Sequence, residues 1–361
     1  MKPIAWAQCR HGIVIAPNWL GDALMALPAL RALETALPEA DLAVLARPAP
    51  AAALAAARLR TPILPWPAAL RFTELLAELR HLRRDGRRLR NLDFALLLPN
   101  SFHAALQAFT LGARLRIGYQ RDRRGWLLTH ALPLPQNGET PSHESFYYLE
   151  LLRRAGLIAS LPPTPTAQLW ADEALCRRWS GRLAGAGPLI VIHAGAAHCE
   201  AKRWPPEYFA ALLARLPSGC RAALVGRAAE RPLTNWLREQ AAARLPLFNL
   251  AGETSLPELL AVLSLADLVV ANDSGPMHLA AALGRPLIAL FGPTNEKETY
   301  PLGPEGWPGP RLLLAENIAC HPCKLRTCPI DHRCMQRLRV QTVLAAIEEH
   351  LRAAAVFGVE H

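Results

Sequence analysis

Short apolar runs alternate along the chain with longer segments of helical periodicity, a pattern typical of parallel α/β sheets. In the first half the pattern predicts strands and helices, in chain order, at residues 12–16, 23–37 (helix), 41–46, 70–84 (helix), 94–98 and 115–118. A second series contains strands at residues 189–193, 221–225, 265–271 and 286–290, and helices at residues 206–216, 229–243 and 255–263. A Pro-rich stretch at residues 161–165 separates the two series.

The chain has 361 residues, of which 51% are hydrophobic, and this length favours two domains with separate cores. We expect a first Rossmann-like domain over residues 1–165 and a second over residues 188–339. Residues 166–187 are predicted to be a linker region. The last apolar pattern, within residues 340–361, predicts a closing helix that packs back on the first domain.

Two strand-to-helix junctions of the second half are candidate anion sites. Residues 265–271 lead into Asn272, Asp273, Ser274 and Gly275, where a helix that contains His278 is predicted to begin. A helix N-terminus has free backbone N–H groups and a partial positive charge, so it stabilises a phosphate. After the strand at residues 189–193, Gly195 and neighbouring alanines allow close backbone approach, and Lys202 adds a point charge.

A third junction, after the first predicted strand, contains Asn18 and Asp22. It lacks the G-x-G-x-x-G spacing of dinucleotide sites, and this disfavours a nicotinamide oxidoreductase.

Three segments together resemble the heptosyltransferases of lipopolysaccharide core synthesis, glycosyltransferase family 9. They are residues 16–34, 193–212 and 269–294. Residues 96–106 and 249–263 resemble the branch of the family that adds the second heptose. The resemblance implies an α/β GT-B fold, in which two doubly wound Rossmann-like domains face a central cleft. It also implies an inverting transfer of L-glycero-D-manno-heptose from ADP-heptose to the first heptose of the inner core on Kdo2-lipid A.

The resemblance further implies roles for single residues. Asp22 corresponds to the catalytic base and Lys202 to the lysine that stabilises the leaving phosphate. The implied donor-binding residues are Gly195, Glu230, Asp273, Ser274, Gly275 and His278. Asn18, Asn100 and Ser101, which follow predicted strands, are candidate acceptor contacts.

Simpler interpretations stay open for these residues. Asp22 and Asp273 suit helix N-caps, and His278 suits a packed core position. Lys202 suits a surface pair with its aromatic neighbour, and Asn100 and Ser101 suit a plain turn. For the whole chain, the alternatives are a glycosyltransferase with another nucleotide sugar or a protein acceptor, and a non-catalytic nucleotide-binding module.

Four of the eight cysteines lie close together, at Cys320, Cys323, Cys328 and Cys334. In a reducing compartment such a group favours a structural zinc or iron site over disulfides, with free thiols as the alternative. His321 and His332 are competing ligands. We expect no cofactor in catalysis itself, because Lys202 and a helix N-terminus occupy the place of a divalent ion.

The net charge of +10 is concentrated in the first half, where residues 1–165 carry 20 basic and 12 acidic side chains. Its two clusters are Arg80, Arg83, Arg84, Arg87, Arg88 and Arg90, and Arg114, Arg116, Arg121, Arg123 and Arg124. They suit either a solvated surface or contact with an anionic acceptor or membrane. Nucleic acid is not expected, since no recognition motif appears. We expect a cytoplasmic protein, peripheral at the inner membrane, without a targeting peptide.

Overall fold

A computed structural model describes residues 3–66, 91–197, 199–241 and 245–356 of the chain. The chain divides into two compact units, unit 1 (Met1–Ala167) and unit 2 (Gln168–His361), which we describe separately. The predicted helix at residues 70–84 and the first arginine cluster lie outside the described residues. Within the described part, none of the helices is long and apolar enough to cross a membrane.

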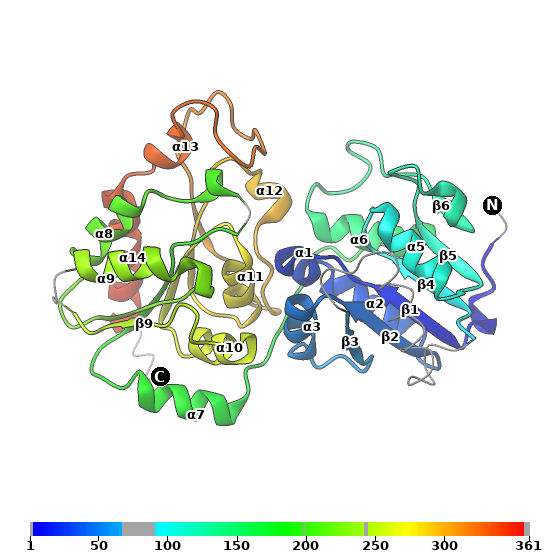
Figure 1. Cartoon of the computed structure of the whole chain (residues 1–361), viewed down its shortest axis with the longest axis horizontal. Helices are drawn as coiled ribbons and strands as arrows, with labels where there is room; N and C mark the ends of the chain where they lie inside the picture. Colours follow the sequence, from blue (N-terminus) through cyan, green and yellow to red (C-terminus); the bar gives the residue numbers. More distant parts are fainter. Residues whose placement is uncertain (1–2, 67–90, 198, 242–244, 357–361) are drawn as a thin grey trace. The chain divides into compact units, whose positions relative to one another are not determined.

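Unit 1 contains a parallel sheet of six strands in the order β3-β2-β1-β4-β5-β6 (Figure 1). Its strands are β1 (His11–Ile15), β2 (Asp41–Ala46), β3 (Ile63–Pro65), β4 (Phe94–Leu97), β5 (Leu115–Tyr119) and β6 (His130–Leu132). Its described helices are η1 (Trp6–Gln8), α1 (Leu20–Met25), α2 (Leu27–Ala36), α3 (Pro48–Ala55), α5 (Phe102–Thr110), η3 (Gly125–Leu127) and α6 (Glu144–Arg154).

Unit 2 repeats this architecture, with the strand order β12-β11-β10-β7-β8-β9. Its strands are β7 (Leu189–His193), β8 (Arg221–Leu224), β9 (Leu247–Asn249), β10 (Leu268–Asn272), β11 (Leu287–Leu290) and β12 (Arg311–Leu313). Its described helices are α7 (Glu173–Arg182), η4 (Glu200–Lys202), α8 (Pro206–Leu213), η5 (Ala228–Glu230), α9 (Arg231–Gln240), α10 (Leu256–Ser264), α11 (Gly275–Ala282), α12 (Glu296–Thr299), α13 (Arg333–Gln336) and α14 (Val340–Val356).

Both sheets are doubly wound, and this topology determines where the candidate functional loops lie. Every central strand is buried along nearly its whole length, as expected for a parallel sheet covered on both faces. The chain reverses direction across the sheet between β1 and β4 in unit 1 and between β7 and β10 in unit 2. Ligands of open α/β sheets bind beyond the carboxyl ends of strands at such switch points.

Several boundaries differ from the predicted ones. The predicted helix at residues 23–37 is two helices, because Pro28, in the first turn of α2, lacks the N–H needed to continue α1. The strand predicted to start at residue 265 starts at Leu268, after the end of α10. The predictions for β2 and β7 match the structure at both ends.

The predicted linker and closing helix both belong to unit 2. Helix α7 lies within the predicted linker region and packs on α10, with Trp179 buried. Helix α14 packs on α8 and β11, and its Val343 and Ile347 are fully buried in the core of unit 2. The apolar face of this helix is therefore used within unit 2.

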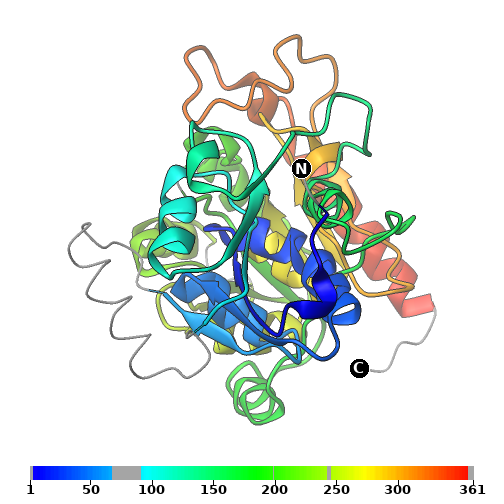
Figure 2. The same ribbon diagram turned by 90° about the vertical axis from the view of Figure 1, so that its right-hand side faces the viewer.

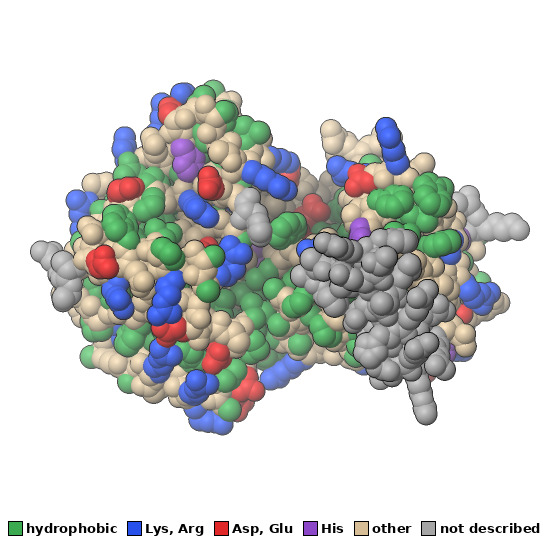
Figure 3. All heavy atoms as spheres, viewed as in Figure 1, with side chains coloured by type: hydrophobic (Ala, Val, Ile, Leu, Met, Phe, Trp, Pro, Cys, Tyr) green, Lys and Arg blue, Asp and Glu red, His purple; other side chains and the backbone are tan. Residues whose placement is uncertain are grey.

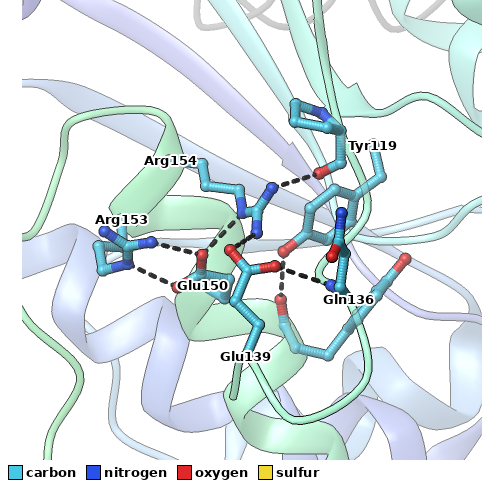
Figure 4. A network of polar contacts seen from close by, with 8 residues as sticks. Tyr119, Gln136, Glu139, Glu150, Arg153 and Arg154 are labelled. Carbon is cyan, nitrogen blue, oxygen red and sulfur yellow. Dashed lines mark hydrogen bonds and ion pairs between the residues drawn. The ribbon is translucent and has the colours of Figure 1, made fainter.

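A buried carboxylate fixes the end of α6 in unit 1 (Figure 4). The Glu150 side chain is 1% exposed and accepts hydrogen bonds of 2.6 and 2.7 Å from Arg153 and one of 2.7 Å from Arg154. Arg154 also pairs with Glu139 and donates to the carbonyl of Pro133. These arginines, Arg153 first, hold the pKa of Glu150 below its usual range although burial opposes this. The network ties α6 to the loop after β6.

We expect Glu150→Ala to lower the free energy of unfolding by about 3 kcal/mol, because it removes the buried carboxylate that accepts from both Arg153 and Arg154. Urea denaturation measures this. Glu173→Ala is the matched control, since Glu173 is 88% exposed and lies 3.9 Å from its arginine. Equal, small losses in the two variants would show that the network contributes little.

Candidate functional site

Four loops meet at the carboxyl edge of the sheet in unit 2. They follow β11, β10, β7 and β8, which are consecutive neighbours in the sheet in that order. The sequence-predicted residues Gly195, Glu230 and Asp273 lie on three of these loops, and Lys202 lies on η4, which follows the loop after β7. The sheet therefore brings together residues that are up to 78 positions apart.

The carboxamide of Asn272 joins two of the loops. Its Nδ2 donates to the carbonyls of Ala194 (2.9 Å) and Gly195 (3.1 Å), and its Oδ1 accepts from the backbone N–H of Trp204 at 3.2 Å. Asn272 and Trp204 are fully buried. All three hydrogen bonds are made in the interior, where leaving them unmade would be costly, so they fix the loop after β7 against the end of β10.

The two predicted phosphate-site residues of opposite charge are paired. Lys202 Nζ lies 2.8 Å from Asp273 Oδ2, and Thr294 Oγ1 donates to the same oxygen at 2.6 Å. The Asp273 side chain is 3% exposed and that of Lys202 is 24% exposed, so the ammonium reaches solvent while the carboxylate does not. An ammonium has three donors, so Lys202 keeps donors for an anion while it holds Asp273.

A second line of polar contacts runs from the buried side chains of Glu230 and His193 to the half-buried Ser274. His193 Nε2 lies 3.7 Å from Glu230 Oε2, and His193 Nδ1 lies 3.0 Å from Ser274 Oγ. Burial raises the pKa of Glu230, but His193 and the backbone N–H of Arg227 outweigh it and bring the pKa to about 2. Glu230 is therefore an ionised hydrogen-bond acceptor at neutral pH.

The other carboxylate oxygen of Glu230 faces the loop after β7. Among the described residues, Oε1 of Glu230 has no hydrogen-bond partner although it is buried. A Cβ atom added at Gly195 would lie 1.8 Å from this oxygen, so only glycine leaves room for it. A buried, charged and unpaired acceptor in a sheet-edge loop suits a hydroxyl group of a ligand.

Helix α11 starts beside this line of contacts and presents its N-terminus to the same edge. Its N-cap is Ser274, not Asp273, and within the described structure the Ser274 side chain does not cap the helix but donates to the carbonyl of Asn272. The N-terminal N–H groups around Gly275 are thus left to an anion. His278 is buried one turn further along α11.

The segment that contains the four clustered cysteines supports the loops at the carboxyl edge of unit 2 (Figures 1 and 2, orange). His332 Nε2 lies 2.6 Å from the carbonyl oxygen of Ala201, next to Lys202. His321 Nδ1 lies 2.7 Å from the carbonyl oxygen of Gly292, and its Nε2 lies 3.1 Å from Glu296. The two histidines predicted as competing metal ligands therefore hold the backbone on either side of the Lys202–Asp273–Thr294 contact.

The predicted metal site gains no support from this geometry. In the part of the chain that the structure describes, no group of three or more His, Cys, Asp or Glu side chains is placed to hold a metal ion. Cys320 is exposed, Cys323 and Cys328 are half-buried, and Cys334 is buried. The contacts of this segment indicate a structural role.

The predicted acceptor residues lie together at the carboxyl edge of unit 1. Asn18 and Asp22 follow β1, and Asn100 and Ser101 follow its neighbour β4. Asp22 lies in the first turn of α1, whose N-cap is Trp19, so the N-cap interpretation of Asp22 is wrong. Ser101 is the N-cap of α5 and accepts from the N–H of Ala104 at 3.3 Å, so its hydroxyl is committed to that helix.

Asn100 belongs to a polar group at this edge. Its Oδ1 accepts a 2.9 Å hydrogen bond from the hydroxyl of Tyr147, whose ring lies 4.5 Å from that of Tyr119. Burial raises the pKa of Tyr147, while Asn100 and Arg121 act in the opposite direction. Tyr147 was not among the predicted site residues, because only the packing of α6 brings it to the end of β4.

Arg124 differs from the other members of the second arginine cluster, because it is fully buried. Its Nε donates to the carbonyl of Tyr119 and its NH1 donates to the carbonyls of Pro99 and Ser101. Burial lowers the pKa of Arg124 to about 10, so it stays charged at neutral pH. Its inclusion in a surface cluster was wrong, since it clamps the loop after β5 to the end of β4.

Comparison with known proteins identifies the family. A model of glycosyltransferase family 9 (heptosyltransferase) matches residues 82–333. Lipopolysaccharide heptosyltransferase 2 of Escherichia coli K12 is 32% identical over 307 residues, which cover 80% of this chain and 85% of that protein. The chain belongs to glycosyltransferase family 9. The resemblance predicted from sequence is thereby confirmed for the family.

Further relatives of this glycosyltransferase agree. Lipopolysaccharide heptosyltransferase 2 of Salmonella typhimurium is 33% identical, with the same coverage of both chains. The solved structure of E. coli ADP-heptose LPS heptosyltransferase II matches with a TM-score of 0.77 and 28% identity, covering 96% of this chain and 99% of that one. The protein is thus an enzyme of the heptosyltransferase type with the GT-B fold, as predicted.

Sequence reasoning missed three residues at the carboxyl edge of unit 2: His193, Asn272 as a bridge between loops, and Thr294. Each is at or just beyond the carboxyl end of a strand, and that position was the signal available in the sequence. Their partners are distant in the chain, so only the strand order reveals the contacts.

The lowered pKa of Glu230 predicts a pH-dependent contribution to stability. Because the folded-state pKa, about 2, lies below the ordinary value of 4.5, the ionised group stabilises the fold above pH 4.5 and this contribution is lost as pH falls toward 2. We expect the difference in unfolding free energy between the wild type and Glu230→Gln to be largest near neutral pH and to shrink over this window. A pH-independent difference in urea denaturation would contradict this assignment.

Proposed function

We propose that this enzyme transfers L-glycero-D-manno-heptose from ADP-heptose to the first heptose of the lipopolysaccharide inner core. One observation carries the donor assignment: a buried ionised carboxylate with an unpaired oxygen lies at the same sheet edge as an uncapped helix N-terminus. The carboxylate suits ribose hydroxyls and the helix suits a diphosphate. The names of the similar proteins support the same donor and acceptor.

In this proposal Glu230 accepts from the ribose and Gly195 provides the room for it. The diphosphate lies at Ser274 and Gly275, and Lys202 supplies a mobile positive charge. As the bond between heptose C1 and the diphosphate oxygen breaks, negative charge grows on ADP, and these donors stabilise it. They do the work that a divalent ion does in other transferases, so the transfer needs no catalytic metal. Asp273 and Thr294 position Lys202.

On the acceptor side, Asp22 is the proposed base. The acceptor hydroxyl attacks C1 from the face opposite ADP, its proton passes to the Asp22 carboxylate, and the configuration at C1 inverts. Asp22 is half-exposed at the carboxyl edge of unit 1, with Asn18 on the same loop and Asn100 on the neighbouring one. Arg121, whose positive charge acts to lower the pKa of Tyr147, is placed to meet an anionic group of the acceptor. Because the acceptor is a lipid, we also propose peripheral contact with the cytoplasmic face of the inner membrane.

Gly195→Ala tests the donor site. The added methyl group displaces the Glu230 carboxylate, so we expect the KM for ADP-heptose to rise about tenfold, equivalent to 1.4 kcal/mol, with a smaller change in kcat. Release of ADP with a heptose-bearing lipid A acceptor provides the assay. Gly181→Ala is the control, because nothing lies within 4 Å of a Cβ atom there. An unchanged KM for the donor in Gly195→Ala refutes the placement of the ribose.

Asp22→Asn tests the base. We expect kcat to fall by about 10²–10⁴-fold, the usual contribution of a general base, while the affinity for ADP measured by calorimetry stays unchanged. An Asp22→Asn enzyme with full turnover would exclude Asp22 as the base. Loss of turnover together with loss of ADP binding would instead indicate a folding defect.

A further inference from the structure

Unit 1 exposes three large aromatic side chains on one surface. Phe102 and Phe109 lie seven residues apart on α5, on the same face of the helix, and are 40% and 51% exposed. Trp126 of η3 is 73% exposed, and its ring centroid lies 6.0 Å from that of Phe102. We call Phe102, Phe109 and Trp126 the aromatic surface. Exposed aromatic residues in a group, unlike single ones, mark an interaction site.

Basic side chains surround the aromatic surface. The guanidinium of Arg116 lies over the Phe109 ring, 5.4 Å from its centroid. Arg121 and Arg123 line, with Trp126, a hollow of about 480 Å³, and Asp122 is the one acidic residue in its lining. Figure 3 shows hydrophobic side chains grouped on the face of unit 1 that it draws. The surface is therefore apolar at its centre and positively charged around it.

The loop that carries Trp126 is rigidly held. Arg124, two residues before it, is fully buried and bonded to three backbone carbonyls, those of Tyr119, Pro99 and Ser101. Arg121 and Arg123 on the preceding turn stay exposed. The exposure of Trp126 is thus a fixed property of the fold, because the loop cannot turn the indole inward without breaking these buried hydrogen bonds.

We propose that the aromatic surface docks on an anionic lipid bilayer, with Trp126 and Phe109 at headgroup depth and Arg116, Arg121 and Arg123 against lipid phosphates. Trp is enriched at membrane–water interfaces because its ring is amphipathic, and arginine is attracted to the negative surface of the membrane. A second copy of the chain fits less well, because a two-fold contact would bring the same arginines face to face. This inference gives a surface to the membrane contact proposed above.

Vesicle sedimentation tests it without the transfer reaction. We expect the wild type to sediment with vesicles of mixed phosphatidylcholine and phosphatidylglycerol, and less with phosphatidylcholine alone or at high salt. The double variant Phe109→Ser/Trp126→Ser should lose binding by about tenfold or more, since it removes the apolar contact. Its matched control is Leu325→Ser/Ile330→Ser, which removes two exposed apolar side chains, 45% and 59% exposed, from unit 2.

A charge reversal gives an independent variant. Arg123→Glu should weaken binding to anionic vesicles, whereas Arg177→Glu, whose side chain is 75% exposed on α7 of unit 2, should not. Thermal unfolding verifies that all variants are folded. The inference is overturned by wild-type binding in both the double variant and Arg123→Glu, or by a wild type that does not bind anionic vesicles. It is also overturned if size-exclusion chromatography shows a dimer that the double variant abolishes.

The test of the docking surface can be distinguished from the test of the proposed function. The double variant should keep the ADP-release rate of the wild type on a detergent-dispersed acceptor and lose rate only on an acceptor embedded in vesicles. A wild type that binds anionic vesicles through this surface but transfers no heptose would refute the proposed function alone. Full activity on detergent-dispersed acceptor without any vesicle binding would refute the docking surface alone.

Discussion

The geometry of the carboxyl edge of unit 2 depends on the hydrogen bonds of the Asn272 side chain. This side chain uses both its carboxamide atoms to join the end of β10 to the loop after β7, across the switch point of the sheet. Those bonds set the position of Gly195, which leaves room for Glu230, and of Trp204, shortly after Lys202. An apolar residue of similar size would leave three backbone groups unpaired in the interior. The geometry of the edge therefore rests on one buried amide.

The ionised carboxylates at this edge already have side-chain partners before a ligand binds. Lys202 is balanced by Asp273, and His193 stands beside the carboxylate of Glu230. The positive potential offered to a diphosphate therefore comes mainly from the backbone at the start of α11, which is rigid and cannot be neutralised by proton loss. Lys202 is the more exposed member of its pair with Asp273, so its ammonium can also bind an anion. Such an arrangement favours specific orientation over strong general attraction of anions.

Much of the architecture was predictable because a buried parallel strand is marked by an uninterrupted apolar run. The strands of the two switch points, β1, β4, β7 and β10, were all found from such runs. Helix α1 and helix α2 were merged because Pro28 is tolerated in the first turn of a helix and so did not look like a break. The packing of α14 on α8 and β11 could not be predicted, because an amphipathic pattern indicates that a face is buried but not which elements cover it.

From the sequence, the candidate site could be predicted only as a set of residues that follow the ends of strands. Asp273 and Lys202 were found at strand-to-helix junctions and Glu230 by the resemblance, but the contact between His193 and Ser274 joins residues 81 positions apart and has no local signal. Arg124 was misjudged for the same reason: an arginine among arginines looks solvated, and only tertiary structure reveals that it is buried.

The clamp made by Arg124 has a geometric consequence. The Arg124 guanidinium binds the carbonyls of Pro99 and Ser101, and Arg124 belongs to the turn that leads to Trp126. The exposed indole is therefore held at a fixed position relative to the end of β4. The height of Asn100 above any surface on which Trp126 rests is then set by the protein and not by the ligand. In the proposed orientation on a membrane, this fixed height would favour acceptors whose reactive sugar lies at one distance from the bilayer.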